Sequence, residues 1–134
     1  FLIQKGLLVL AGFENSDTPA AIEQMASKII NLRIFSDSSG KMNLSGQDVG
    51  AEYLLVSQFT LYANCRHGNR PSFEKAGAKE HAQKCYEHFV TVFRTIAHSN
   101  LVHHSPFGAF LSLELINVGP VTIWLDSSEL QQSN

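Results

Sequence analysis

Residues 53–61 constrain the fold most, because these nine residues are rich in β-branched and aromatic side chains and place apolar residues on both alternating sets through their first half. That pattern is typical of a strand covered on both faces. The apolar run at residues 7–11, which Gly12 ends, has the same character. The sequence therefore predicts a sheet with residues 53–61 as a central strand and residues 7–11 as a second buried strand.

Two segments carry the periodicity of amphipathic helices. The first follows a cluster of turn and cap formers at residues 15–19, where Pro19 suits the first helical position. Its apolar residues recur at three- and four-residue spacing at Ile22, Met25, Ala26, Ile29 and Ile30. A second helix is predicted from about residue 78 to residue 98, with an apolar stripe at Ala82, Cys85, Phe89, Phe93 and Ile96.

The segments between these elements are shorter. Residues 32–35 are predicted as a short strand that ends at the turn formers 37–40, and residues 41–44 return beside it. Residues 64–72 form a polar loop with the densest positive charge of the chain. Residues 98–106 are irregular in pattern, so no element is predicted there.

The last part of the chain alternates between apolar and polar residues at 111–116 and again at 121–126, which predicts two strands joined through residues 117–120. The resulting order of elements predicts an α/β fold with α+β layering, in which two main helices pack on a sheet in a single domain. At 134 residues and 44% hydrophobic content, the chain has enough apolar side chains for one core. Residues 1–127 are assigned to this domain and residues 128–134 to a polar tail.

Charge and composition limit the class of partner. A formal net charge of −2 and a pI near 6.3 supply no broad positive surface for a nucleic-acid backbone, so any RNA contact is expected to be local, at residues 64–72. Cys65 and Cys85 are too few for a disulfide framework, which favours a reducing, cytoplasmic setting. No apolar run approaches the roughly 20 residues that cross a bilayer, so no membrane partner is expected. The first residue is Phe rather than Met, and the N-terminus is expected to be incomplete.

One candidate for chemistry is the motif formed by Ser57, Gln58, Phe59 and Thr60. It offers two hydroxyls and an amide at or beyond the end of an apolar strand, where backbone N–H groups can line an oxyanion site. In the alternative interpretation, these side chains only satisfy neighbouring backbone groups.

Two glycine-containing segments are further candidates. Gly119 and Pro120 fit a tight turn, with or without a cis bond, or a rigid loop that presents backbone carbonyls to a ligand. Phe107 and Gly108 fit a β-bulge or a close approach of a ligand to the backbone. No metal site is expected, because the six histidines match no established zinc spacing.

Together these segments resemble a known family. Residues 57–61 and 117–122 are similar to the two signature motifs of the D-aminoacyl-tRNA deacylases, also called D-tyrosyl-tRNA(Tyr) deacylases, in the family's order and at about its separation. Further segments resemble the family at residues 6–10, 31–35 with 39–43, 70–73 and 107–109. The resemblance extends over residues 1–127.

The resemblance implies an enzyme of chiral proofreading in translation. Such an enzyme hydrolyses the ester of D-aminoacyl-tRNA and glycyl-tRNA, without a cofactor, and releases the free amino acid and tRNA. It implies cytoplasmic localisation, the aminoacylated 3′ end of tRNA as a partner, no DNA partner, and a homodimer with a barrel-like β core. Each subunit would lend its cis Gly119-Pro120 loop to the partner's pocket, where the two carbonyls face the α-amino group and exclude an L side chain.

The remaining roles also follow from the resemblance. The pocket near the ester would be lined by Ser57, Gln58, Phe59 and Thr60, with Thr60 in a positioning role and backbone N–H groups stabilising the oxyanion. The family relies on the 2′-hydroxyl of the terminal adenosine, and the proton carrier stays open. Phe107 and Gly108 would bind that adenosine through main-chain contacts.

The chain departs from the family at two places. Family members begin earlier, with a strand that holds a Gln-Arg pair, and residues 103–106 replace the usual Thr-Gly before the Phe-Gly-Ala segment. Two other functions stay open, and these departures support the first of them. One is a catalytically silent tRNA- or nucleic-acid-associated binding module of the same fold, and the other is a general small-molecule hydrolase.

Overall fold

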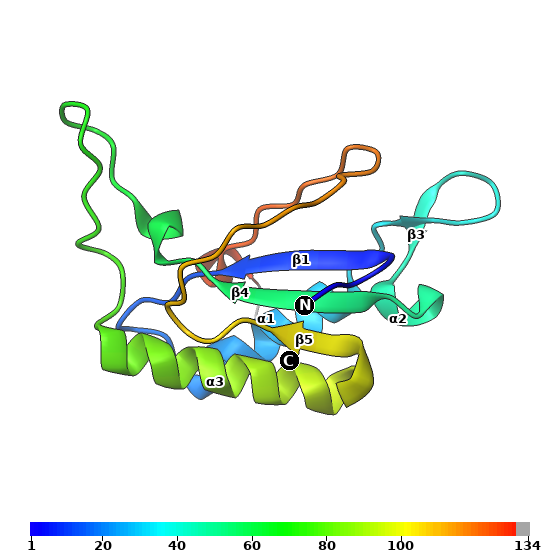
Figure 1. Ribbon diagram of the computed structural model, residues 1–134. Helices are drawn as coiled ribbons and strands as arrows, with labels where there is room; N and C mark the ends of the chain where they lie inside the picture. Colours follow the sequence, from blue (N-terminus) through cyan, green and yellow to red (C-terminus); the bar gives the residue numbers. More distant parts are fainter. Residues whose placement is uncertain (131–134) are drawn as a thin grey trace.

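The computed structural model describes residues 1–130 and has a parallel sheet at its centre (Figure 1). The three strands lie in the order β1 (Gly6–Ala11), β4 (Glu52–Ser57) and β5 (Val102–His104). β1 and β4 pair in parallel along six positions, from Gly6 opposite Glu52 to Ala11 opposite Ser57. The prediction of two strands, with residues 53–57 in the central one, is therefore confirmed, whereas β1, predicted as buried, is mostly half-buried and leaves Leu10 exposed.

The central strand is shorter than the sequence predicts. The Gln58 backbone N–H donates to the Ala11 carbonyl at 2.7 Å, and the chain then leaves the sheet and forms the 3-10 helix η1 (Phe59–Tyr62). Residues 58–61 still alternate between polar and apolar side chains, so the sequence pattern does not reveal that the strand ends at Ser57. Residues 58–61 therefore lie on a helical turn beyond the carboxyl end of β4.

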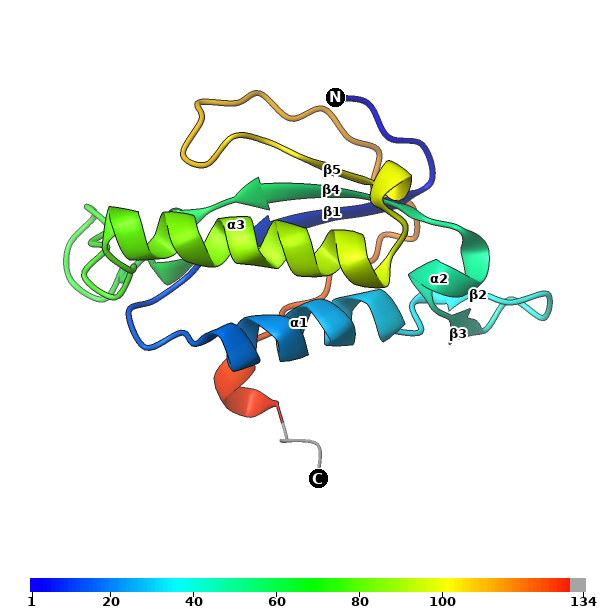
Figure 2. The same cartoon turned by 90° about the horizontal axis from the view of Figure 1, so that it is seen from below.

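Two helices cover one face of the sheet. α1 (Pro19–Asn31) and α3 (Lys79–Ile96) lie side by side against the strands, as Figure 2 shows from below. Thr18 caps α1 by accepting a hydrogen bond from the Ala21 amide at 3.2 Å, and Pro19 occupies the first turn, as predicted. The two-layer arrangement confirms the predicted α/β class for a single chain.

The core lies between these two layers and is rich in aromatic rings. Phe93 meets Tyr53 edge-on at 5.2 Å between ring centroids, and it meets Phe89 at 5.1 Å. The Tyr86 hydroxyl, also buried, lies 3.0 Å from the Leu55 carbonyl and 2.8 Å from the Ser105 carbonyl. It thereby fastens α3 to β4 and to the segment after β5.

A small unit joins α1 to the central strand. β2 (Phe35–Ser36) and β3 (Met42–Leu44) pair in antiparallel fashion around the predicted turn, and α2 (Gly46–Val49) follows. A reciprocal capping box between Ser45 and Asp48 begins α2. The prediction of two short strands here is confirmed, although the first begins at Phe35 rather than at residue 32.

The end of the chain corrects three predictions. Residues 98–106, predicted as irregular, contain the 3-10 helix η2 (Ser99–Leu101) and the edge strand β5. Residues 111–116 and 121–126, predicted as strands, form none. A strand needs a hydrogen-bonded neighbour, and a lone two-stranded hairpin is marginal in water. Instead, residues 109–126 form an exposed arm that stands above the sheet (Figure 1).

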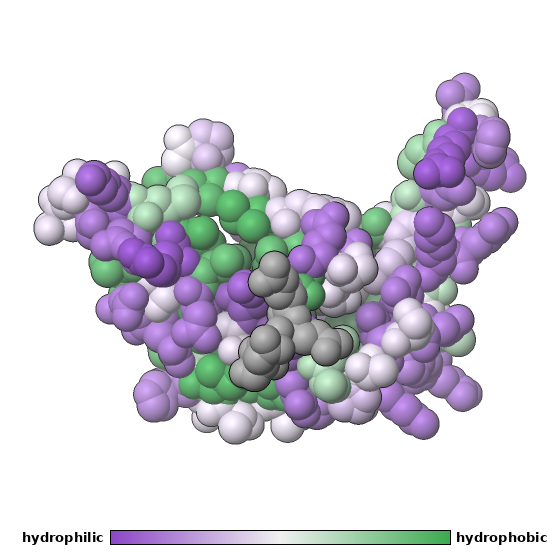
Figure 3. Space-filling view, turned by 180° about the vertical axis from the view of Figure 1, so that it is seen from behind, coloured by the Kyte–Doolittle hydropathy of each residue, from purple (hydrophilic) through white to green (hydrophobic). Residues whose placement is uncertain are grey.

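The arm exposes many large apolar side chains, among them Phe110, Leu111, Leu113, Leu115, Ile116, Val118, Ile123 and Trp124. Apolar atoms gather beside it in Figure 3, whereas loop 64–72 on the other side is hydrophilic. The sheet of the described residues is open rather than closed into a barrel. Within residues 1–130 no helix has both the length and the apolar character needed to span a membrane. The predicted tail begins with the 3-10 helix η3 (Ser127–Glu129), and residues 131–134 lie outside the described part.

Candidate functional site

The motif of residues 57–60 lies where β4 ends and η1 begins. The Gln58 side-chain amide donates a hydrogen bond to the Thr60 hydroxyl oxygen at 2.5 Å, so each of these two side chains fixes the orientation of the other. The Ser57 hydroxyl oxygen accepts a hydrogen bond from the Gly108 backbone N–H at 3.1 Å. Two segments that are 51 residues apart in sequence therefore meet at this point.

The backbone of η1 offers donors at the same place. The first N–H groups of a helix have no intrahelical acceptor, and those of Phe59 and Thr60 head this turn. No acceptor among residues 1–130 bonds to either group. The Phe59 ring is 57% exposed and packs edge-on against Phe73 at 5.0 Å between centroids. The site thus combines free N–H donors with an accessible apolar wall, a combination that suits the binding of an oxyanion.

The predicted adenosine-binding residues lie beside a shallow hollow of about 460 Å³. Phe107 contributes to its wall and lies 5.8 Å from the Tyr86 ring, between centroids. Gly108 follows with φ of +70°, a conformation that favours glycine. The other residues that line the hollow are Gln83, Tyr86, Glu87, Val90, Thr91, His104 and Pro106. The contribution of α3 is not visible in the sequence, because Gln83, Glu87 and Thr91 match the exposed polar face of an ordinary helix.

Gly119 and Pro120 lie in the exposed arm and are joined by a cis peptide bond. Gly119 has φ of +123°, and an added Cβ would come within 2.8 Å of the Val121 side chain, so only glycine fits without strain. Asn117 fastens the turn, since its side-chain carbonyl oxygen accepts from the Val121 N–H at 3.1 Å. In Figure 1 the tip of the arm points away from η1, so the chain does not bring this turn to residues 57–60.

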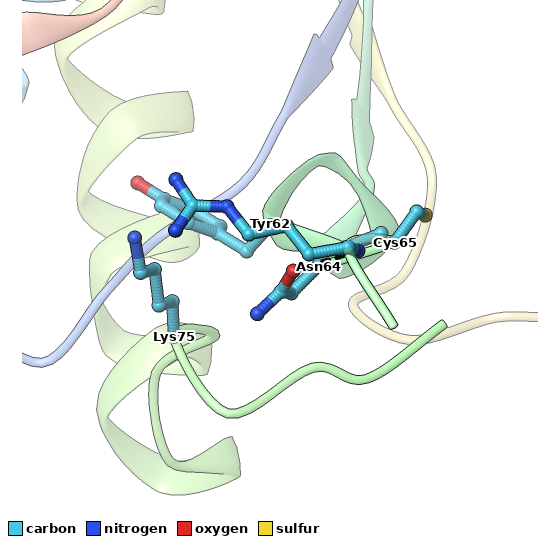
Figure 4. Close-up of a pocket in the computed structure, with 6 residues that line it drawn as sticks. Tyr62, Asn64, Cys65 and Lys75 are labelled. Atoms are coloured by element: carbon cyan, nitrogen blue, oxygen red, sulfur yellow. Dashed lines mark hydrogen bonds between the residues drawn. The ribbon is translucent and has the colours of Figure 1, made fainter. Parts of the chain in front are cut away.

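A second hollow, of about 400 Å³, adjoins η1 on the other side (Figure 4). It is lined by Tyr62, Ala63, Asn64, Cys65, Arg66 and Lys75. Burial raises the pKa of the Tyr62 phenol to about 12, with further contributions from the carboxylates of Asp17, Glu14 and Asp126. The phenol therefore stays protonated at neutral pH. The sequence identifies the positive loop but not Tyr62 and Lys75, which the fold brings to it.

No group of three His, Cys, Asp or Glu side chains among residues 1–130 is arranged to hold a metal ion. One pair of such side chains lies on α3, where the His81 ring nitrogen lies 3.4 Å from the Cys85 sulfur. Burial raises the pKa of the Cys85 thiol, and the Coulombic effect of Asp17 adds to this. Cys85 is buried and His81 half-buried, so the pair packs at the edge of the core.

Comparisons with known proteins identify a family and several similar proteins. A family described as D-Tyr-tRNA(Tyr) deacylase matches residues 2–126. A D-aminoacyl-tRNA deacylase of Desulfatibacillum aliphaticivorans is 50% identical over 93% of this chain and 84% of its own length. One of Thermosipho melanesiensis is 48% identical over 96% of this chain and 85% of its own. A solved structure called c-Myc DNA Unwinding Element Binding Protein is 40% identical, with a TM-score of 0.85 over 90% of this chain and 81% of that one.

Proposed function

This chain belongs to the D-Tyr-tRNA(Tyr) deacylase family, and from that membership we infer that it is a D-aminoacyl-tRNA deacylase. It hydrolyses the ester that joins a D-amino acid to tRNA and so serves quality control in translation. The observation that carries this conclusion is the match of residues 2–126 to the family, supported by relatives of 48–50% identity over most of their length. Glycyl-tRNA is proposed as a second substrate, because glycine has no side chain for a chirality filter to reject.

The ester is proposed to bind at η1. There the free N–H groups of Phe59 and Thr60 point to the carbonyl oxygen, which becomes an oxyanion when water attacks the ester carbon. Gln58 holds Thr60 through its 2.5 Å hydrogen bond, which supports a positioning role for Thr60. Ser57 fastens the neighbouring segment through Gly108. The 2′-hydroxyl of the terminal adenosine remains available to carry the proton.

The terminal adenosine is proposed to bind beside Phe107 and Gly108. This position is supported by the direct bond from Gly108 to Ser57, because the adenosine carries the ester and the bond brings the two proposed binding segments together. The hollow beside Phe107 provides aromatic surface together with polar side chains of α3. Main-chain groups around Gly108 are accessible because this residue is exposed and carries no side chain.

The Gly119-Pro120 loop is proposed to filter chirality in the pocket of a second copy of the chain. Two features support exchange between copies: the loop lies on an arm that points away from its own η1, and the arm exposes apolar side chains over most of its length. An open sheet with an exposed arm also provides edges that a partner can cover, as a barrel-like dimer core requires. Rigid carbonyls that clash with an L side chain reject it without needing affinity for the D form.

Mixed dimers test this exchange. A Gln58→Ala/Thr60→Ala variant keeps an intact filter loop beside a damaged pocket, whereas Pro120→Ala keeps an intact pocket and loses the filter. Alone, the first is expected to be slow and the second to hydrolyse both D- and L-tyrosyl-tRNA. Mixed dimers should recover hydrolysis that is selective for the D ester, because the intact loop of one subunit serves the intact pocket of the other. Unselective hydrolysis by the mixed dimers contradicts exchange.

A second function is favoured by one comparison. The relative of 40% identity carries a name that refers to DNA binding, which suits the catalytically silent nucleic-acid-binding module. The two functions differ in one measurement. Folded protein that binds tRNA or DNA and hydrolyses no D-aminoacyl-tRNA is the binding module, and turnover of the D ester excludes it.

A further inference from the structure

A second cluster of polar side chains lies at the end of η1 that is farther from the proposed ester site. It surrounds the hollow between η1 and loop 64–72, which Arg66, Lys75 and Asn64 line together with Tyr62. Figure 4 shows the side chains of Asn64 and Lys75 turned toward the same space, whereas the Cys65 thiol points away from it. The proposed hydrolysis uses none of these groups.

The two cations of this hollow have no acidic partner. Within residues 1–130 the carboxylate ion pairs are those of His88 with Glu23 and of His103 with Glu52, so no carboxylate lies within 4.0 Å of Arg66 or Lys75. Like charges that face one hollow repel each other, and a bound anion removes that repulsion. The arrangement therefore favours a negatively charged ligand.

The positive charge is also local. Residues 64–75 hold three of the ten Lys and Arg side chains of the chain and one of its twelve acidic side chains. The whole chain nevertheless has a formal net charge of −2. An anionic polymer would thus be attracted to this segment more strongly than the net charge of the chain suggests.

Hydrogen bonds hold the hollow next to the proposed ester site. Asn64 and Ser72 exchange two backbone hydrogen bonds, of 2.7 and 2.9 Å, which close the base of the loop. The Arg66 N–H donates to the side-chain carbonyl oxygen of Asn64 at 3.1 Å, so the Asn64 side-chain N–H₂ group remains a free donor. Since a 3-10 helix rises ~2.0 Å per residue, the two ends of η1 are roughly 6 Å apart along its axis.

We propose that Arg66, Lys75 and Asn64 bind a backbone phosphate of the tRNA acceptor strand, close to the end that carries the ester. The position of the ester is taken from the proposed function, on which this inference rests in part. Arginine matches two phosphate oxygens with its planar fork, lysine adds a point charge, and the asparagine amide donates a further hydrogen bond. Tyr62, protonated at neutral pH, forms the wall beside them, and none of the three carboxylates that act on its phenol, those of Asp17, Glu14 and Asp126, lines the hollow.

Binding of uncharged tRNA tests the site independently of catalysis. The variant Arg66→Ala/Lys75→Ala is compared with Lys28→Ala/Lys84→Ala, which removes the same charge from exposed positions on α1 and α3. We expect the first variant to bind about tenfold more weakly, and the slope of log K against log salt concentration to fall by about 1, the value for one phosphate contact. The control should change less than about twofold, and both should keep the melting temperature of the wild type. Equal binding by the two variants overturns the proposal.

A substrate without the acceptor strand separates this site from the proposed activity. D-Tyrosyl-adenosine carries the ester but no backbone phosphate, so Arg66→Ala/Lys75→Ala should hydrolyse it at the wild-type rate while losing about tenfold in kcat/KM on D-tyrosyl-tRNA. Equal losses on both substrates overturn the phosphate assignment. If the wild type hydrolyses neither substrate, the proposed activity fails and the tRNA-binding assay still decides the phosphate site. A DNA hairpin of the acceptor-stem sequence that binds as tightly as tRNA, with the same loss in the variant, overturns the assignment to tRNA.

Discussion

The hydroxyl oxygen of Ser57 accepts a hydrogen bond from the backbone N–H of Gly108 at 3.1 Å, which joins the last residue of β4 to the Phe107-Gly108 segment. Ser57 lies directly before the turn proposed to bind the ester, and Gly108 lies in the segment proposed to bind the adenosine. The hydrogen bond therefore sets the distance between the two halves of the proposed substrate.

We expect Ser57→Ala to let the distance between these two segments vary without unfolding the protein. A hydrogen bond of this kind contributes about 1 kcal/mol, which corresponds to roughly a fivefold change in an equilibrium. We expect kcat/KM on D-tyrosyl-tRNA to fall about fivefold, mostly through KM, because the adenosine is less well placed. Steady-state kinetics measure this, and an unchanged KM would show that the contact does not position the substrate.

Tyr86 and Tyr53 are both buried in the core, and they differ in whether the hydroxyl is hydrogen-bonded. The single proton of the Tyr86 hydroxyl is shared between the Ser105 carbonyl at 2.8 Å and the Leu55 carbonyl at 3.0 Å, whereas the buried Tyr53 hydroxyl has no partner among residues 1–130. Removing a bonded hydroxyl leaves a buried carbonyl unsatisfied and costs about 1–3 kcal/mol, but removing an unbonded one relieves its desolvation. In urea unfolding, Tyr86→Phe should lower stability by about 1–2 kcal/mol and Tyr53→Phe should leave it equal or higher. Equal losses would contradict these roles.

The two cysteines should differ sharply in reactivity. Cys65 is exposed, whereas Cys85 is buried in the core and burial raises the pKa of its thiol. Since the thiolate is the reactive form, we expect an alkylating reagent to modify Cys65 quickly in the folded protein and Cys85 only after unfolding. Mass spectrometry of peptides from native and denatured samples measures this. Rapid labelling of Cys85 in the native protein would show that α3 is not packed as described.

The stability that Asp37 gives to the turn between β2 and β3 depends on pH. Hydrogen bonds from the Ser39 hydroxyl, and from the Lys41 and Ser39 amides, hold the pKa of Asp37 below its ordinary value of 3.8. A lowered folded-state pKa stabilises the fold above the unfolded value, and that contribution is lost as the pH falls through the folded value. The stability difference between the wild type and Asp37→Asn should therefore be present at neutral pH and shrink below pH 3.8. A difference that does not vary with pH would contradict this.

The sequence predicts those helices and strands whose own residues show an apolar run, a periodic stripe or a capping residue. The apolar run before Gly12 and the capped stripe after Thr18 contain the information for β1 and α1, since burial and capping depend on neighbouring residues. β5 cannot be predicted in this way, because three residues are too few to display a period and its pairing depends on β4, which lies far away in the sequence.

Contacts over long sequence distances explain the other differences. Residues 111–116 have the alternation of a strand, yet within one chain no neighbouring strand pairs with them. The site shows the same limit: the motif at Ser57 is visible in the sequence, whereas its contact with Gly108 and the approach of Lys75 to Arg66 arise only when the chain folds.

The most direct test of the account compares the initial rates at which the purified protein hydrolyses D-tyrosyl-tRNA and L-tyrosyl-tRNA prepared from the same tRNA, with glycyl-tRNA alongside. We expect hydrolysis of the D and glycyl esters and no hydrolysis of the L ester above the uncatalysed rate. Folded protein that leaves all three esters intact, or that cleaves the D and L esters equally, would contradict a chirally selective deacylase.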